Sequence, residues 1–187
     1  PVVKLAVFNG PVTPVLAQYI ERAIQNAEAE GAAALVVELD TPGGSVDITT
    51  GITKNMTAAG VPVIVYVAPS GAHAGSAGTF ITLAGHLAAM APGSSIGAAS
   101  PVSGEGADLD ETMKAKLTNI LVADIKNLAA RRGEKAVEWA QRAVAEAAAA
   151  TAEEALDLGV IDVVATDVSD LLDKVDGRKV TVAGTEV

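Results

Sequence analysis

Short apolar segments alternate with longer helical patterns through the first third of the chain, and this alternation limits the fold more than any other feature. The apolar segments lie at 2–8, 33–40 and 61–67, and each has about the length of one strand. The segments between them, at about 14–31 and 47–59, are long enough to form helices. Strands joined by such crossovers pair in parallel. The pattern therefore predicts an α/β fold with a parallel sheet, in which 2–8 is a buried strand.

The rest of the chain is less regular. A polar segment at 97–108 is rich in glycine, serine and proline, and we expect a mobile loop there. Thr151 and Glu154 have the spacing of a capping box. The other expected elements are a helix at 75–86, a strand at 87–91, helices at 109–131 and 134–146, a strand at 160–165 and a hairpin at 178–187. The sequence has no internal repeat, and its 187 residues fit one domain.

Composition excludes several classes of function. The net charge is −10 and there is no basic run, so nucleic acid is not an expected partner. The chain has no cysteine and only two histidines, far apart, so we expect no disulfide, metal site or cofactor. The longest apolar run, at 61–68, is much shorter than the roughly 20 residues that span a bilayer. Because the chain begins at Pro1 rather than Met, a signal peptide or a membrane anchor can precede it outside the sequence.

Two adjacent glycines, Gly43 and Gly44, follow Pro42 at the end of a predicted strand. Ligands of open α/β sheets bind at the carboxyl ends of strands, where bare N–H groups of glycines can hold a substrate oxygen. A tight turn with no role in chemistry explains the same dipeptide.

Ser76 lies between a predicted strand and a predicted helix, in the stretch "GAHAGSAGTF". It is either a nucleophile, with the N–H of Ala77 beside it to stabilise an oxyanion, or the N-cap of the helix. A histidine base is poorly placed. His86 would lie about 15 Å along the helix from Ser76, and His73 precedes the serine by only one turn.

A lysine can replace histidine as the base if apolar surroundings lower its pKa. Lys114 and Lys116 both lie at the start of the helix that follows the polar loop. Helical periodicity places Lys114 nearer the centre of the apolar stripe, but it does not choose between them, and either lysine can also be a solvated surface residue.

Five segments, taken together in order and spacing, resemble the protease domain of the NfeD-type membrane-bound serine proteases, the stomatin-operon partners within the Clp protease/crotonase superfamily. The segments are "ELDTPGG", "YVAPSGAHAGSAGTFI", "MAPGSSIGA", "KLTN" and "TAEEALDLGVIDVVA", and they cover nearly the whole chain. The resemblance implies a spiral of β-β-α units and a Ser-Lys dyad formed by Ser76 and Lys116, since the "KLTN" pattern begins at Lys116. It also implies oxyanion donors at Gly44 and Ala77, with Gly43 shaping the turn.

The same resemblance implies a serine endopeptidase that cleaves apolar segments of stomatin- or prohibitin-like membrane proteins. Residues 1–187 would be a single protease domain of a longer membrane-anchored chain, soluble in itself, on the extracytoplasmic side, and a homodimer or larger homo-oligomer. The loop at 97–108 would be a lid. Two features depart from the family pattern: Gly75 stands where relatives often have alanine, and the segment 143–150 is unusually rich in alanine, which we expect to affect a surface helix or a partner contact.

Two other functions stay open. A crotonase-type acyl-CoA enzyme shares the fold and the glycine oxyanion hole but commonly uses carboxylates, for which Glu38 and Asp40 are the nearby candidates. A non-catalytic scaffold that binds stomatin-like proteins would retain the dyad only as a vestige.

Overall fold

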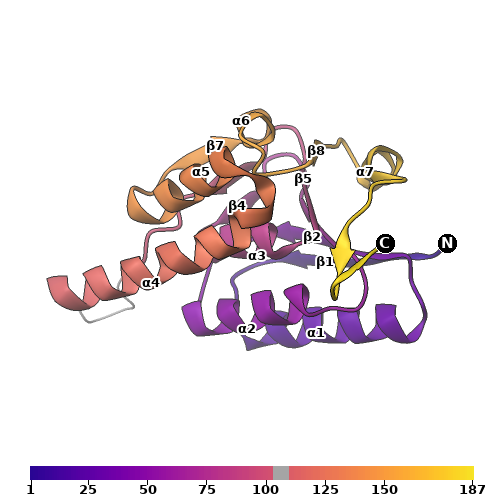
Figure 1. The fold of residues 1–187 in the computed structure, drawn as a ribbon, viewed down its shortest axis with the longest axis horizontal. Helices are drawn as coiled ribbons and strands as arrows, with labels where there is room; N and C mark the ends of the chain where they lie inside the picture. Colours follow the sequence, from indigo (N-terminus) through magenta and orange to yellow (C-terminus); the bar gives the residue numbers. More distant parts are fainter. Residues whose placement is uncertain (103–109) are drawn as a thin grey trace.

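The computed structural model describes residues 1–102 and 110–187. Its centre is a five-stranded parallel sheet in the order β1-β2-β3-β5-β8 (Figure 1). The strands are β1 (Val3–Asn9), β2 (Ala34–Asp40), β3 (Val63–Val67), β5 (Leu87–Met90) and β8 (Val163–Val164). The expected α/β fold with a parallel sheet is thus confirmed, since every neighbouring pair in this sheet is parallel.

Helices cover both faces of the sheet, as the hydrophobic strands require. The helices are α1 (Pro14–Ala29), α2 (Val46–Thr57), α3 (Ala77–Ala84), α4 (Glu111–Ala129), α5 (Glu134–Ala145), α6 (Ala152–Asp157) and α7 (Val168–Val175), with a 3-10 turn η1 (Ala130–Arg132) after α4. Buried residues of α1, α2 and α3 pack on one face in one core cluster. Leu171 and Val175 of α7 pack on the other face, against alternate residues of β2 and β3.

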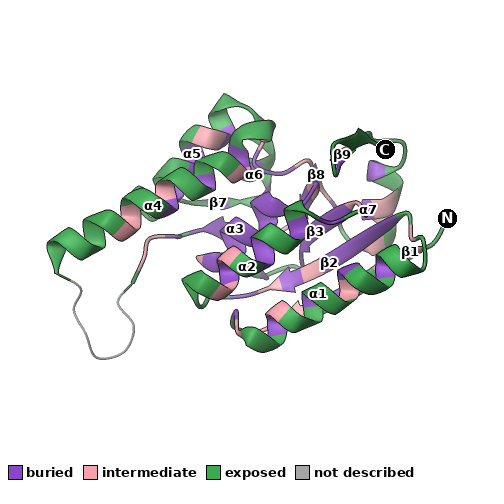
Figure 2. Cartoon of the chain, turned by 60° about the horizontal axis from the view of Figure 1, so that its bottom comes forward, coloured by how far each residue is buried: buried purple, intermediate pink, exposed green. Residues whose placement is uncertain are grey.

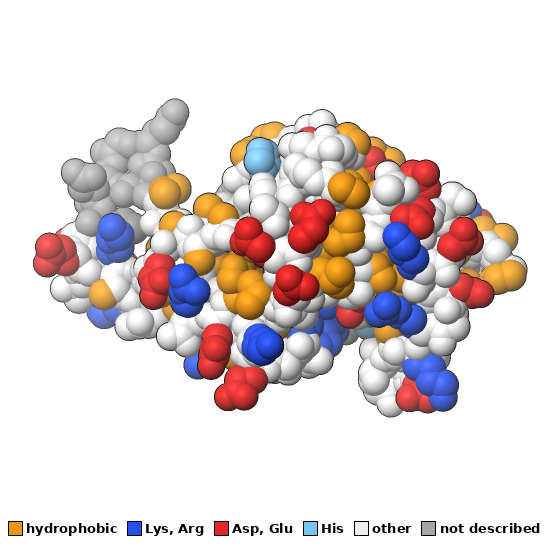
Figure 3. All heavy atoms as spheres, turned by 90° about the horizontal axis from the view of Figure 1, so that it is seen from above, with side chains coloured by type: hydrophobic (Ala, Val, Ile, Leu, Met, Phe, Trp, Pro, Cys, Tyr) orange, Lys and Arg blue, Asp and Glu red, His pale blue; other side chains and the backbone are white. Residues whose placement is uncertain are grey.

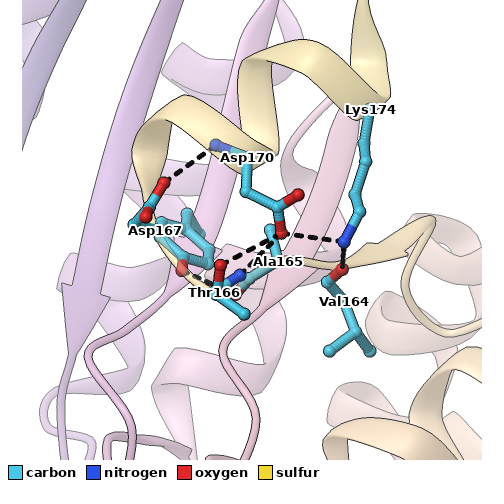
Figure 4. Close-up of polar contacts among 7 residues, drawn as sticks. Val164, Ala165, Thr166, Asp167, Asp170 and Lys174 are labelled. Carbon is cyan, nitrogen blue, oxygen red and sulfur yellow. Dashed lines mark hydrogen bonds and ion pairs between the residues drawn. The ribbon is translucent and has the colours of Figure 1, made fainter.

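A network of polar contacts holds α7 against the sheet (Figure 4). The carboxylate of Asp167 caps the helix by accepting from the Asp170 N–H at 2.8 Å, and Asp170 accepts in turn from the Thr166 N–H at 2.9 Å and from Lys174 at 2.8 Å. Below them, the buried hydroxyl of Tyr66 in β3 donates to the backbone carbonyl that follows β8, at 2.7 Å. The helix is therefore fixed at its first turn.

A second, smaller sheet lies beside the first in the order β4-β6-β7. Its strands are β4 (His73–Gly75), β6 (Ser95–Gly97) and β7 (Ala149–Thr151), the first two parallel and the last antiparallel to β6. A third core cluster joins this sheet to α3, α4, α5 and α6. The chain ends in the expected hairpin, β9 (Thr181–Val182) and β10 (Thr185–Glu186).

The first half of α4 projects from the body of the molecule (Figures 1 and 2). The buried residues of this helix, Leu121, Ile125 and Ala129, all lie in its second half, whereas 111–116 are exposed. On the face of the molecule shown in Figure 3, acidic and basic side chains are interspersed with small hydrophobic areas. Within the described residues, no helix is both long enough and apolar enough to cross a membrane.

Four sequence expectations are corrected. The segment 2–8 was expected to be buried, but β1 lies at the edge of the sheet, and Leu5 and Val7 are 50% and 53% exposed. The strand at 160–165 contains only two strand residues, and β4, β6, β7 and α7 were not anticipated. The alanine-rich segment 143–150 begins in the last turn of the helix α5 and ends in the strand β7, so only part of it is helical. The expected loop at 97–108 begins in β6, and its residues 103–108 lie outside the described residues.

Candidate active site

The carboxyl end of β2 and the strand β4 bring the two candidate motifs together. Thr41, at the end of β2, forms a parallel bridge with Ala74 of β4. The turn containing Gly43 and Gly44 follows Thr41 in the chain, and Ser76 lies two residues after Ala74. Motifs separated by more than 30 residues in the sequence therefore become neighbours at one edge of the sheet.

Ser76 has an unusual backbone conformation, with φ 50° and ψ −113°. It precedes the first residue of α3, but its side chain makes no capping hydrogen bond. The hydroxyl is therefore not the N-cap group that the alternative interpretation required. A non-glycine residue at positive φ costs about 1–3 kcal/mol, a strain that is typical of functional sites and of the nucleophile turn between a strand and a helix.

Gly43 lies directly against the serine. A Cβ atom on Gly43 would be 2.6 Å from Ser76 Cβ and 3.2 Å from Ser76 Oγ, and the backbone of Gly43 has φ +117°. Both the close approach and the backbone angle require glycine here.

The N–H groups of Gly44 and Ala77 are available to a substrate oxygen. Val12 bridges to Gly44 by donating to the Gly43 carbonyl at 2.8 Å and accepting from the Ser45 N–H at 3.3 Å, so the N–H of Gly44 faces away from Val12. Ala77 is the first residue of α3, where the helix offers no acceptor. Within residues 1–102 and 110–187, neither N–H has a hydrogen-bond acceptor. By contrast, the Gly43 N–H donates to Thr41 Oγ1 at 3.2 Å.

A cavity of about 260 Å³ opens beside the serine, between α2 and α4. Its residues come from the glycine turn and α2 (Gly44, Val46, Thr49, Thr50, Thr53, Lys54, Thr57), from the serine turn and α3 (Ser76, Ala77, Phe80), from 99–102 (Ala99, Pro101, Val102) and from α4 (Leu117, Leu121, Asp124, Asn127, Leu128). Each threonine hydroxyl donates to a carbonyl within or just before α2, which leaves methyl groups as the main contribution of this wall. The cavity therefore suits apolar groups near the serine.

Lys116 is exposed on the projecting half of α4 and does not line this cavity. Among the described residues it makes no hydrogen bond or ion pair, and Lys114 is also exposed. The structure therefore brings Ser76, Gly43, Gly44 and Ala77 together but leaves the lysine apart. Around the helix, Lys116 lies about 20° from Asn127 and Lys114 about 20° from Leu121, and both Asn127 and Leu121 line the cavity.

Three cavity residues with charged or amide side chains, Lys54, Asp124 and Asn127, were not predicted as site residues. Lys54 belongs to a stripe of α2 at three- and four-residue spacing, which was a usable signal for a shared helix face. Nothing in the sequence showed that this face of α2 is turned toward α4.

Neither histidine is placed to activate Ser76. His73 Nδ1 pairs with Ser95 Oγ at 2.5 Å, and its backbone N–H donates to Asp40 Oδ1 at 2.9 Å. His86 is buried, and its Nδ1 accepts from the Val63 N–H at 3.0 Å. Within the described part of the chain, no cluster of three or more His, Asp or Glu side chains could hold a metal ion.

The chain is similar to one known family and to several of its members. Residues 2–184 match the family model "NfeD1b, N-terminal domain". The chain is 42% identical to the membrane-bound protease PH1510 of Pyrococcus horikoshii, over 95% of this chain and 40% of that protein. It is 31% identical to the membrane protein NfeD1b of Bacillus subtilis, over 62% of this chain and 25% of that protein. The chain thus spans less than half the length of these relatives.

Two solved structures named 1510-N membrane-bound stomatin-specific protease are similar over the whole chain. One is a serine-to-alanine mutant, with a TM-score of 0.91, 40% identity and 91% of that chain covered. The other is a lysine-to-alanine mutant in complex with a substrate peptide, with a TM-score of 0.91, 39% identity and 86% of that chain covered.

Proposed function

Because the chain belongs to the family of NfeD1b N-terminal domains, we propose that it is a serine endopeptidase with a Ser-Lys dyad formed by Ser76 and Lys116. One observation carries the proposal. A serine at positive φ faces a cavity whose rim also holds two N–H groups that have no acceptor among the described residues, those of Gly44 and Ala77. A nucleophile next to paired donors is the arrangement that acyl transfer requires.

In the proposed reaction, Ser76 Oγ attacks the carbonyl carbon of a peptide bond while Lys116 Nζ accepts the hydroxyl proton. The N–H groups of Gly44 and Ala77 stabilise the oxyanion of the tetrahedral intermediate. Lys116 then donates the proton to the leaving amine, which leaves an acyl group on Ser76. A water molecule, deprotonated by Lys116, hydrolyses this ester and restores the free serine.

Lys116 is a better candidate for the base than Lys114, because its separation from Ser76 is closer to that of the corresponding pair in the relatives. The serine and lysine replaced in the two solved relatives are separated by one residue more than Ser76 and Lys116, but by three residues more than Ser76 and Lys114. A substrate bound in the cavity would extend along α4 and displace water from the ammonium group.

The proposed substrate is an apolar segment of a stomatin- or prohibitin-like membrane protein. The methyl-lined wall of α2, with Phe80 and Leu121 opposite, supports apolar side chains next to the scissile bond. The relatives named stomatin-specific support this class of substrate. We also propose that the domain acts on the extracytoplasmic side as a homodimer or larger assembly, attached to the membrane through other parts of a longer chain.

Three variants test the dyad on a fluorogenic apolar peptide. Ser76→Ala and Lys116→Ala should each reduce kcat by at least about 10³-fold, since nucleophile and base act as a unit. Lys114→Ala is the matched control, because it removes an equally exposed lysine from the same helix, and it should retain wild-type kcat. Undiminished cleavage by Ser76→Ala would refute the proposal, and peptide binding without cleavage by the wild type would indicate a scaffold. Turnover of an acyl-CoA without peptide cleavage would indicate a crotonase-type enzyme.

A further inference from the structure

Thr41 lies at the point where the glycine turn and the strand leading to the serine meet, and it is fully buried. Its backbone N–H donates to the His73 carbonyl at 2.7 Å, and its carbonyl accepts from the Gly75 N–H at 3.0 Å. These two bonds attach the end of β2 to β4. The side chain of Thr41 plays no part in them and is left to contact both sides of the site.

The two ends of this side chain contact different parts of the site. The hydroxyl Oγ1 accepts a hydrogen bond from the Gly43 N–H at 3.2 Å. The methyl group packs against α3, where a Cβ atom on Gly78 would lie 2.7 Å from Thr41 Cγ2. One side chain thus contacts the glycine turn and the first turn of the helix that begins at Ala77.

Two hydrogen bonds to Gly43 together determine the direction of the Gly44 N–H, and the Thr41 hydroxyl forms one of them. In a planar trans peptide, the C=O of Gly43 and the N–H of Gly44 point in opposite directions. The Gly43 carbonyl is held by the Val12 N–H at 2.8 Å, and the Gly43 N–H is held by Thr41. Two adjacent glycines have great conformational freedom. These two hydrogen bonds restrict Gly43 on both sides, and the Gly44 N–H is then directed away from Val12.

We propose that Thr41 is a positioning residue of the active site: its hydroxyl holds the Gly43 N–H and so helps to fix the turn that directs the Gly44 N–H beside that of Ala77. The inference rests on the proposed function, because it assigns these two groups as oxyanion donors. It also gives Gly43 a distinct role, since the Gly43 N–H is bound by Thr41 and does not serve the substrate.

The test compares Thr41→Val, which keeps the shape but removes the acceptor, with Thr41→Ser, which keeps the hydroxyl. Loss of a whole oxyanion donor costs about 10²–10³-fold in kcat, and a misdirected donor should cost less, about tenfold. Thr41→Val should therefore lower kcat about tenfold with KM unchanged, whereas Thr41→Ser should stay within about threefold of the wild type. Thr82→Val is the control, because Thr82 is equally buried and its hydroxyl bonds only within α3.

Amide proton exchange measured by NMR adds a readout that does not depend on activity. The Gly43 amide should exchange faster in Thr41→Val and remain protected in Thr41→Ser and Thr82→Val. An unchanged kcat in a folded Thr41→Val variant, or a tenfold loss in Thr41→Ser, would overturn the inference. Wild type and Ser76→Ala are measured in parallel. If they cleave equally, the proposed function fails, and the exchange of the Gly43 amide still decides whether Thr41 fixes the turn.

Discussion

Replacement of Gly43 by alanine should strongly reduce the rate of catalysis, because the added Cβ atom would collide with Ser76. The new Cβ would lie 2.6 Å from Ser76 Cβ, whereas ordinary contacts begin near 3.4 Å. Neither Cβ can rotate away, so the turn and the serine must separate by about 1 Å, a displacement that costs about 10²-fold in rate. An alanine held at the φ of +117° is also strained, which should lower the free energy of unfolding by about 1–3 kcal/mol. The assay pairs kcat/KM on the apolar peptide with urea denaturation.

Gly51→Ala is the matched control for this substitution. Gly51 lies on the exposed side of α2, and a Cβ there would meet no atom within 4 Å. The control should keep wild-type kcat/KM and gain about 0.5–1 kcal/mol of stability, because alanine suits a helix better than glycine. If Gly43→Ala kept more than about half of the wild-type kcat/KM, the close approach of turn and serine would not matter for catalysis, and the reasoning would be wrong.

Three further predictions concern stability. Burial, aided by nearby carboxylates, raises the pKa of Tyr66 to about 12 from 10.0. The unfolded chain therefore loses the proton first as pH rises, and the free energy of unfolding should fall by about 2 kcal/mol between pH 10 and 12. This alkaline loss should be absent in Tyr66→Phe when denaturation is followed by circular dichroism. Burial, reinforced by the positive charge of Arg131, lowers the pKa of His86 below 6.5. The unfolded chain therefore takes up the proton first as pH falls, so the free energy of unfolding should decrease below pH 6.5. This decrease should be smaller in His86→Gln. Arg132 and Asp162 form a 2.8 Å ion pair in which the arginine side chain is only 4% exposed. Arg132→Met would leave Asp162 without this partner and should lower the free energy of unfolding by about 3 kcal/mol in urea denaturation. A loss under about 0.5 kcal/mol would show that the ion pair does not stabilise the fold.

The main sheet could be predicted because its inner strands carry a strong signal. The segments that became β2 and β3 are continuous apolar runs, as expected for strands covered on both faces. The edge position of β1 could not be predicted from its own residues, because valine and leucine at 2–8 suit an inner strand equally well. The strands β4, β6 and β7 have three residues each, too few for periodicity to identify.

The candidate site was predictable in its residues more than in its geometry. The residue types at Gly43, Gly44 and Ser76 suited a turn followed by either a nucleophile or a helix cap, but only the fold showed that a Cβ atom on Gly43 would lie 2.6 Å from Ser76 Cβ. The side-chain contacts of Thr41 left no sequence signal, since threonine before Pro-Gly-Gly is also suited to an ordinary turn. The choice of Lys116 rests on a family pattern, because both lysines at the start of α4 are exposed.

The small sheet also sets the order in which a newly synthesised chain can complete its site. The serine follows β4, which pairs with β6, and β6 pairs on its other side with β7, whose last residue is Thr151. After the ribosome has added Ser76, it must add some 75 further residues before the last residue of β7 has been synthesised. Until then Gly97, whose carbonyl accepts from the Ser76 N–H at 2.9 Å, has no partner strand behind it. The nascent chain therefore carries its candidate nucleophile about 75 residues before the strand that completes the small sheet around it.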